Sequence, residues 1–377
     1  MGWFDRMKIS FFSDSGPPII GGGQRYIQNL GAELVRNGFD VHWMYTRLPN
    51  TKKEEIIDGI KCHRINIPFG RTFFPIVSIP KVYKLVKSSD ISQFDTFYSG
   101  LSGWLSGKMS KKPYLLIVYE FFQELWDIMA KNKVESFFYK TAEKYLANSP
   151  YPLFLTISEY TKKRMINLGC DENKIRVVYP GIDHTLFHPN YEKRLKTNKF
   201  VIGWVGRMNL SQSKNLPMLL DAFKIVKQKN SNVILALDGP DFYKLESIIK
   251  EKGLVIGKDV IYNGCVEQNK LPNFYCSLDL YVSSSLSEGF GLSVVEAEAC
   301  GVPVVCFDVG ALPEVVKDGK TGLILKEKTS ESLANGILKM MEGDKLKIYG
   351  KNATNWTEQF DWKKTAKESI KVYEEIL

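Results

Sequence analysis

The sequence lacks several features that would narrow its class directly. Its six cysteines show no C-x-x-C spacing, its histidines number only four, and no D-x-D occurs. No apolar run approaches the ~18–20 residues that span a bilayer. These absences argue against a zinc site, a disulfide-built fold and a membrane-spanning chain. Free thiols in a reducing compartment fit better, so we expect a cytoplasmic protein.

The start of the chain also lacks the pattern of a secretory signal. Met1–Ile9 carries Asp5, Arg6 and Lys8 and leads straight into a strand pattern. The 377 residues are 44% hydrophobic and 25% charged. Such a chain is long enough for two domains with an extensive core.

Positive charge is concentrated in the first half. Residues 1–190 hold 25 Lys and Arg against 18 Asp and Glu, whereas residues 191–377 hold 26 against 24. A basic half fits an anionic partner, or simply a soluble surface. Phe69–Lys87 mixes aromatic, aliphatic and basic residues, which suits peripheral contact with an anionic membrane. Because Pro75 and Pro80 interrupt this segment, a packed helix or loop is the favoured reading. No aromatic-basic platform for nucleic acid is present, so we expect no nucleic-acid partner.

Strand and helix patterns alternate along the chain. Lys8–Ser13 reads as a buried strand, followed by a Gly/Pro loop, a helix ending at Asn37 and the strand Asp40–Thr46. Further strand patterns are Tyr114–Tyr119, Leu153–Ile157, Arg176–Tyr179, Phe200–Val205, Val233–Asp238, Val260–Tyr262, Leu280–Ser284 and Val302–Phe307. This alternation predicts an α/β protein with doubly wound sheets.

The polar segment 189–199 marks the expected domain boundary. We therefore predict an N-terminal Rossmann-like domain over residues 1–190 and a C-terminal one over residues 191–355. Residues 356–377 would end in a helix from Trp362 that packs back toward the N-terminal domain.

The chain is organised around Ser285–Ala297. Glu288 and Gly289 begin a turn that leads into a helix from about Leu292 to Cys300, where Gly301 permits a left-handed exit. Glycines at a helix N-terminus let backbone N–H groups approach an anion. Glu288 and Glu296, eight positions apart, suit hydroxyl groups beside that anion, so the stretch suits a sugar diphosphate. A plain strand-to-helix turn is the alternative.

Two cations accompany this stretch. Arg207 follows the strand Phe200–Val205, and Lys214 precedes the next helix, so both belong to the edge of the sheet where Glu288 lies. Arg offers a planar fork and Lys a mobile point charge, and both can stabilise a diphosphate leaving group. In the first half, the triplet Gly21–Gly23 opens a helix and can approach a ligand closely. Tyr119 and Glu120 follow another strand, so they also lie near a ligand edge.

The order and spacing of these motifs resemble the retaining GT-B glycosyltransferases with a Glu-x7-Glu motif, the family called glycosyl transferases group 1 or family 4. Besides the residues above, the resemblance includes Pro180–Asp183, Gly264–Val266, Gly310 with Glu314 and Phe360–Trp362. It implies two Rossmann-like domains facing a cleft, with a nucleotide sugar on the C-terminal domain and the acceptor on the N-terminal one.

The resemblance also implies residue roles. Arg207, Lys214 and the amides of Phe290, Gly291 and Leu292 would hold the diphosphate. Glu288 would contact the donor sugar, Glu296 the ribose and Val266 the base, while Gly22 and Gly23 would close over the phosphates. The implied reaction is retaining, metal-independent transfer from a UDP- or GDP-sugar to a hydroxyl acceptor, such as a lipid-linked or cell-surface glycan. No cofactor or metal is expected.

One position departs from the family pattern. Many relatives carry His where Tyr119 stands, so the usual contact of this residue with the donor sugar is in doubt. A non-catalytic nucleotide-sugar-binding protein of the same fold, or a nucleotide-sugar 2-epimerase, are the alternatives. Tyr119 and Glu120 are assigned to the acceptor or sugar side.

Overall fold

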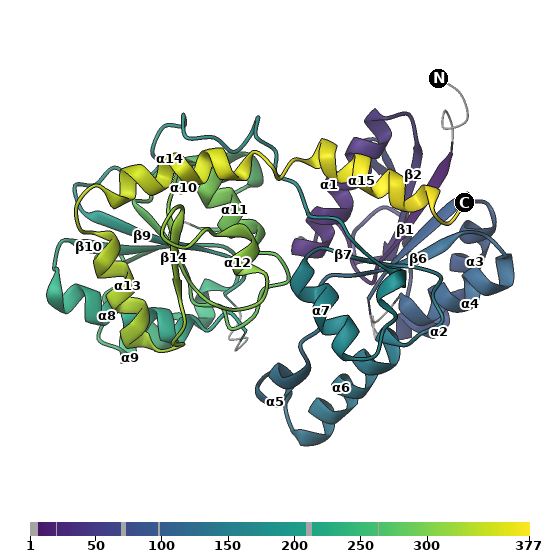
Figure 1. Cartoon of the computed structure of the whole chain (residues 1–377), viewed down its shortest axis with the longest axis horizontal. Helices are drawn as coiled ribbons and strands as arrows, with labels where there is room; N and C mark the ends of the chain where they lie inside the picture. Colours follow the sequence, from purple (N-terminus) through teal and green to yellow (C-terminus); the bar gives the residue numbers. More distant parts are fainter. Residues whose placement is uncertain (1–6, 20, 69–72, 97–98, 209–212, 263) are drawn as a thin grey trace. The chain divides into compact units, whose positions relative to one another are not determined.

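The computed structural model describes residues 7–19, 21–68, 73–96, 99–208, 213–262 and 264–377. The chain divides into two compact units, each built on its own sheet (Figure 1). The first unit comprises Met1–Trp126, Asn132–Gly181 and Trp362–Leu377, and the second Asp127–Lys131 and Ile182–Asp361. The first of these divisions, after Gly181, comes before the polar segment 189–199 that was predicted as the boundary. Ile182 already belongs to the second unit, where it donates its N–H to the carbonyl of Phe360 at 3.2 Å.

In the part of the chain described, the first sheet has eight strands in the order β3-β4-β2-β1-β5-β6-β7-β8, all parallel to their neighbours except β3. Its strands are β1 Lys8–Phe12, β2 Asp40–Thr46, β3 Glu54–Ile57, β4 Ile60–Ile65, β5 Ile91–Asp95, β6 Tyr114–Val118, β7 Phe154–Thr156 and β8 Ile175–Val177. The α-helices that precede residue 182 are α1 Gly22–Arg36, α2 Phe74–Val77, α3 Ile79–Lys87, α4 Gly100–Ser110, α5 Trp126–Met129, α6 Lys133–Ala147 and α7 Glu159–Asn167.

The second sheet, counted over the same ranges, has six parallel strands in the order β11-β10-β9-β12-β13-β14. They are β9 Phe200–Val205, β10 Val233–Asp238, β11 Val260–Tyr262, β12 Leu280–Ser283, β13 Val304–Phe307 and β14 Gly322–Leu325. The helices are α8 Leu216–Lys229, α9 Glu246–Glu251, α10 Leu271–Tyr275, α11 Leu292–Ala299, α12 Leu312–Val315, α13 Ser330–Met340 and α14 Lys345–Thr357. The predicted pair of doubly wound α/β units is confirmed.

Local sequence accounts for these elements. Strands such as β6 and β10 are continuous apolar runs buried along nearly their whole length, as parallel strands covered on both faces must be. Ser158 caps α7 by accepting the N–H of Thr161 at 3.2 Å. Pro75 and Pro80 stand in the first turns of α2 and α3. The favoured reading of a packed helix is confirmed for residues 74–87, where the two prolines begin two separate helices with buried apolar residues, since proline is tolerated at a helix start. Phe69 and the next three residues of that segment lie outside the described residues.

The last helix, α15 Trp362–Glu374, packs on the first unit. Its Trp362 ring lies 5.8 Å from that of Tyr26 on α1, and its Tyr373 hydroxyl donates to Gln93 on β5 at 2.8 Å. Tyr373 thus anchors the end of the chain to a strand 280 residues earlier in the sequence, and Trp362 anchors it to α1.

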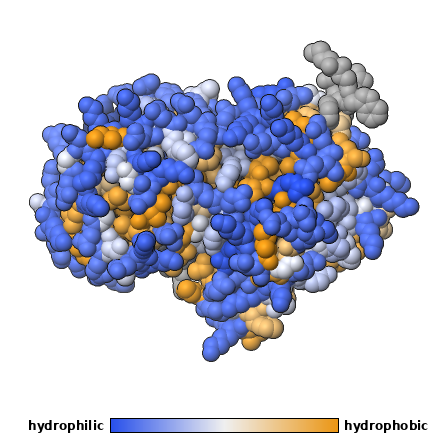
Figure 2. All heavy atoms as spheres, viewed as in Figure 1, coloured by the Kyte–Doolittle hydropathy of each residue, from blue (hydrophilic) through white to orange (hydrophobic). Residues whose placement is uncertain are grey.

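Hydrophobic side chains also reach the surface of the first unit. Several large ones on α2, α4 and α6 are more than a third exposed. Figure 2 shows hydrophobic residues at the lower tip of the region that carries α5 and α6. Within the described ranges, no helix is both long enough and apolar enough to cross a bilayer.

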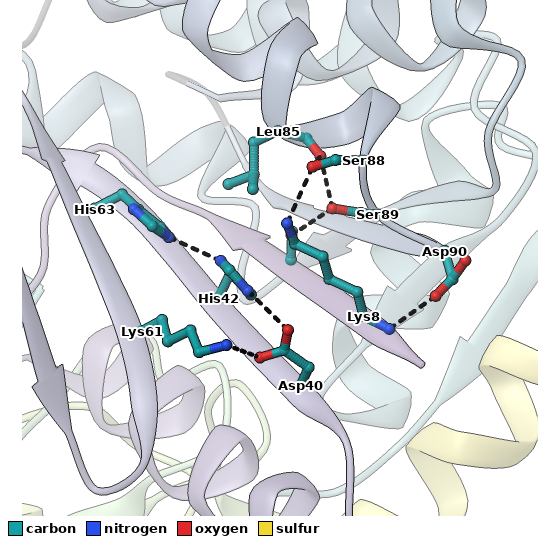
Figure 3. A network of polar contacts seen from close by, with 10 residues as sticks. Lys8, Asp40, His42, Lys61, His63, Leu85, Ser88, Ser89 and Asp90 are labelled. Carbon is teal, nitrogen blue, oxygen red and sulfur yellow. Dashed lines mark hydrogen bonds and ion pairs between the residues drawn. The ribbon is translucent and has the colours of Figure 1, made fainter. Parts of the chain in front are cut away.

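A polar network joins the opening residues of β1, β2 and β4, at the edge where these strands begin (Figure 3). The His42 and His63 rings share a hydrogen bond of 2.8 Å, and Asp40 contacts His42 at 3.2 Å and Lys61 at 2.7 Å. Burial lowers the pKa of His42 to about 4. This network lies at the edge opposite the carboxyl ends of the strands, where ligands of parallel sheets bind.

Candidate functional site at the carboxyl edges of the two sheets

Each sheet has a topological switch point beside its first strand. β9 lies between β10 and β12, and β1 lies between β2 and β5. In open parallel sheets, ligands bind at such a point, beyond the carboxyl ends of the strands. The segments that leave β9 and β12 begin at Gly206 and Ser284, and they contain the predicted cations and Glu288. The topology therefore defines a candidate site in each unit.

Lys214 and Glu288 meet at the switch point of the second unit. The Lys214 Nζ lies 2.5 Å from Glu288 Oε1, and the Ser285 hydroxyl donates to the same oxygen at 2.8 Å. Ser284 fixes the lysine by donating its hydroxyl to the Lys214 carbonyl at 2.8 Å. The lysine side chain is 34% exposed and the glutamate 14%. An exchangeable ion pair therefore stands at the surface of this site.

Arg207 takes a different partner. Its Nη1 lies 3.4 Å from Oδ2 of Asp241, in the turn after β10, and Lys244 contacts the same carboxylate at 3.5 Å. The turns after β9 and β10 are in close contact, since a Cβ added to Gly239 would lie 1.9 Å from the carbonyl oxygen of Gly206. The structure thus joins Arg207 to Asp241 and Lys214 to Glu288, on segments that follow neighbouring strands.

Two glycines hold the backbone around Glu288. Gly310, with φ +57°, leaves so little room that an added Cβ would lie 2.2 Å from the Glu288 carbonyl oxygen. Ala311 donates its N–H to that oxygen at 2.8 Å. Gly291 has φ +98° at the N-cap of α11. Side chains rarely adopt these left-handed conformations, so glycine is required at both turns.

The N-terminus of α11 presents backbone donors. Gly291 provides no side-chain cap, and the first turn contains no acidic residue. The first N–H groups of any helix have no partner within the helix, and the dipole places positive potential there. Phe290 is buried and packs edge-on against Phe360, with 5.4 Å between ring centroids. The amides of residues 290–292 are thus anchored beside the ion pair, a suitable place for a phosphate.

Glu296 lies inside the protein, unlike Glu288. It is 4% exposed and accepts a hydrogen bond from the Tyr275 hydroxyl at 2.8 Å. Tyr281 is close to both glutamates. Burial raises the pKa of its hydroxyl, and the charges of Glu288 and Glu296 raise it further. The Tyr281 hydroxyl donates a hydrogen bond to the Ser293 hydroxyl at 3.0 Å.

Val266 lies in the loop after β11. Its N–H donates to Oδ1 of Asp238 at 3.2 Å, and its side chain is half-buried. Tyr262 stacks on Phe242 with 4.0 Å between centroids and donates its hydroxyl to the Gly239 carbonyl at 3.0 Å. This aromatic pair connects the loop to the turn that holds Asp241.

In the first unit, Gly22 and Gly23 begin α1. A Cβ at Gly22 would have no heavy atom within 4 Å, whereas one at Gly23 would lie 3.2 Å from the ring of Tyr119. Tyr119 also contacts Tyr26 edge-on at 5.7 Å. Its hydroxyl is buried and has no hydrogen-bond partner among the described residues. Burial raises the pKa of this phenol well above its usual value, and Asp95 raises it further.

Asp95 is a residue that the sequence analysis missed. It ends β5, is buried, and accepts a hydrogen bond from Ser99 at 2.9 Å. Burial and then the charge of Asp14 raise the pKa of its carboxyl well above the usual range. Recognition of β5 as a strand would have identified Asp95, because it stands at the carboxyl edge. Glu120, half-buried, follows Tyr119 at this edge.

The cysteines and the potential metal ligands can also be compared with the expectations from sequence. All six cysteines are free thiols, and Cys62, Cys170, Cys300 and Cys306 are buried. In the portion of the chain with assigned positions, no group of three or more His, Cys, Asp and Glu side chains is arranged to hold a metal ion.

Two parallel-sheet units with polar groups at their switch points form the architecture of the GT-B glycosyltransferases. Sucrose-phosphate synthase from Thermosynechococcus elongatus is similar to the chain with a TM-score of 0.83, 21% identity and 98% coverage of both chains. Anabaena Alr3699/HepE, solved in complex with UDP-glucose, has a TM-score of 0.76 and 22% identity over 98% of this chain and 100% of that one. The chain has the predicted GT-B fold.

Sequence comparison identifies the family of the chain as well as its fold. The model of Glycosyltransferase Family 4 matches residues 20–186, and that of Glycosyl transferases group 1 matches residues 190–356. The uncharacterized glycosyltransferase MJ1069 of Methanocaldococcus jannaschii is 26% identical over 99% of both chains. The two models together cover most of the chain, which therefore belongs to the glycosyltransferases of group 1 and family 4, and the family resemblance inferred from its motifs is confirmed.

Proposed function

We propose that the protein transfers a sugar, with retention of anomeric configuration and without a metal, from a UDP- or GDP-sugar to a hydroxyl acceptor. The observation that carries this proposal is the Lys214–Glu288 ion pair beside the uncapped N-terminus of α11. A diphosphate bound there would meet a mobile ammonium group and backbone N–H donors. The neighbouring carboxylate suits sugar hydroxyls and would repel the phosphate.

Donor binding would exchange the partners of both cations. The diphosphate attracts Lys214 away from Glu288 and Arg207 away from Asp241, because two phosphate charges outweigh one carboxylate. The ammonium group is a third exposed and the guanidinium half exposed, so both can rotate toward a ligand. Glu288, released from Lys214, then accepts hydrogen bonds from the donor sugar. Until a donor binds, Glu288 and Asp241 offset part of the positive charge of Lys214 and Arg207.

The remaining donor contacts follow from the same edge. We assign Glu296, positioned by the Tyr275 hydroxyl, to the ribose, and Val266 to the base. The UDP-glucose bound to Alr3699/HepE supports uridine as the first base to test. In the first unit, we assign Gly22 and Gly23 to donor binding, and Tyr119 and Glu120 to the acceptor or sugar side.

Catalysis would depend on charge at the leaving group. As the bond from the sugar to the phosphate breaks, negative charge grows on the diphosphate, where Arg207, Lys214 and the amides of residues 290–292 stabilise it. The acceptor oxygen bonds to the anomeric carbon on the face that the phosphate leaves, which gives retention, and the departing phosphate oxygen takes the proton of the acceptor hydroxyl. The backbone amides and the two cationic side chains supply the positive charge that a metal ion provides in metal-dependent enzymes.

Tyr119 supports one alternative, a binding protein without transferase activity. Its half-buried side chain, with a buried hydroxyl, stands at the sequence position of the family histidine, and its ring lies beside Gly23. Basic composition in the first half favours an acceptor that carries phosphate or a lipid, such as a lipid-linked or cell-surface glycan.

The test measures release of nucleoside diphosphate from UDP- and GDP-sugars with a panel of hydroxyl acceptors, with and without EDTA. We expect acceptor-dependent release that EDTA leaves intact, and NMR of the product should show the donor's anomeric configuration. Tight nucleotide-sugar binding with no turnover for any acceptor favours the binding protein. Inversion, or loss of activity in EDTA, contradicts the proposed mechanism.

A further inference from the structure

Helix α6 in the first unit carries its apolar stripe on the outside. Val134, Phe137, Phe138 and Tyr145 are spaced along one face of the helix, and their side chains are 79%, 72%, 66% and 62% exposed. The buried positions of the same helix are Ser136, Glu143 and Ala147. An amphipathic helix at the surface of a globular protein normally turns its apolar stripe toward the core.

A buried carboxylate fixes this orientation. Glu143 accepts hydrogen bonds from the N–H groups of Phe122 and Gln123 at 2.8 Å, the Gln123 side-chain amide at 2.7 Å and the Trp126 ring N–H at 2.8 Å. Rolling α6 to bury its aromatic stripe would break all four bonds and leave a buried carboxylate without partners. The exposed stripe is therefore built into the fold.

A cavity of about 550 Å³ opens beside the stripe. Its walls are mostly aromatic or aliphatic and come from α2, α4, α5, α6 and the segment after α6. Among them, Phe138 and Tyr145 belong to the stripe, while Trp104 and Leu146 lie deeper in the wall. Trp126 stacks on Tyr139 at 4.3 Å to close one side. The cavity and the stripe thus form one continuous apolar surface.

The surroundings of this surface are basic on the side of α2 to α4, whereas residues 124–147, which carry the stripe, hold four lysines and four acidic residues. Helices α2 to α4 and the two residues after them, 74–112, contain six lysines but only two acidic residues, both outside the helices. The exposed Lys108 lies 5.7 Å from the centre of the Trp104 ring, which lines the cavity. Lys144 is exposed next to Tyr145 on α6. Lysines around an apolar face with aromatics are the pattern of proteins that lie on an anionic bilayer.

We propose that this face docks on a membrane that contains anionic phospholipid, with the α6 stripe in the headgroup layer and one acyl chain in the cavity. Aromatic rings are favoured at that depth, and lysine ammonium groups pair with lipid phosphates. A second copy of the chain is a poorer occupant, because a symmetric contact would bring these lysines against the same lysines. The proposal adds a lipid site to the protein and does not depend on the proposed transfer reaction.

Flotation of the full-length protein with vesicles tests the docking. We expect the protein to float with vesicles of phosphatidylglycerol and phosphatidylcholine, to float less in high salt, and to bind phosphatidylcholine alone weakly. The double variant Phe137→Ser and Phe138→Ser should lower binding by at least about tenfold, since two exposed aromatic anchors are lost. Tyr243→Ser, at a residue 69% exposed in the second unit, is the matched control and should bind as wild type.

Brominated phosphatidylglycerol tests the cavity, because bromine on an acyl chain quenches nearby tryptophan fluorescence. Quenching should be strong in the wild type and mostly lost when Trp104→Phe and Trp126→Phe are combined. Glu143 keeps its three other donors in that variant, so the stripe should still face outward and the variant should still float. The docking is overturned if the wild type does not float, or if the Phe137→Ser and Phe138→Ser double variant floats as well as the wild type. An equal loss of vesicle binding in the Tyr243→Ser control overturns it as well. Persistent quenching without Trp104 and Trp126 overturns the cavity assignment. Circular dichroism and UDP affinity, unchanged in each variant, separate these results from misfolding and from the transfer reaction.

Discussion

Replacement of Lys214 by alanine is the most informative single change in the second unit. Its Nζ lies 2.5 Å from Glu288 Oε1, and the side chain is a third exposed. A pair with this exposure contributes up to about 1 kcal/mol to stability. Lys214→Ala should therefore fold, with a melting temperature close to that of the wild type. Loss of one preorganised donor to a developing oxyanion costs about 10²–10³ in kcat, or about 2.7–4 kcal/mol.

The assay is nucleotide release under saturating donor, with thermal unfolding measured in parallel. Lys250→Ala, at an exposed lysine on α9, is the control and should retain wild-type turnover. Lys214→Arg keeps the charge but changes the geometry, so its rate should lie between the two. A kcat for Lys214→Ala within about threefold of wild type corresponds to less than 1 kcal/mol of barrier and would refute the assignment.

Three further predictions address the supports of the site and the fold. Gly310→Ala should lower the free energy of unfolding, measured with denaturant, by at least about 1–3 kcal/mol through its left-handed φ alone. The added Cβ would also displace the backbone of Glu288, so kcat should fall as well. Tyr275→Phe leaves the buried Glu296 short of a donor, so it should lower stability by about 1–3 kcal/mol and weaken UDP binding in calorimetry. Because the pKa of His42 is about 4 when folded and near 6.5 when unfolded, unfolding takes up a proton between these values. Stability should therefore be complete above pH 6.5 and fall by up to about 1.4 kcal/mol per pH unit toward pH 4, a slope that His42→Gln should reduce. Wild-type unfolding curves for either of the first two variants, or a pH slope that His42→Gln leaves unchanged, would contradict the corresponding argument.

Much of the second unit could be predicted from sequence because its signals are local. The strand β12, the glycine turn and helix α11 follow from an apolar run, two glycines and the exit at Gly301, whose φ is +78°. The proximity of Lys214 to Glu288 followed from one rule, that parallel strands share a carboxyl edge. The pairing of Arg207 with Asp241 did not follow, since it depends on how two turns contact each other through Gly206 and Gly239.

The first unit was harder to predict because long-range contacts decide its details. β5 reads ISQFD, and its polar residues hide a strand that is fully buried. Asp95 was missed for the same reason. The stripe on α6 has ordinary helical spacing, so its sequence alone suggests an inward-facing apolar side. Only the hydrogen bonds of Glu143 determine that the stripe faces outward.

A crystal structure with bound UDP tests the central claim most directly. We expect the diphosphate at the N-terminus of α11, within about 3 Å of the amides of residues 290–292 and of the Lys214 ammonium. Lys214 should have left Glu288 in that complex. A nucleotide bound at another edge of the sheet, or a Lys214 that still pairs with Glu288 beside the bound diphosphate, would contradict it.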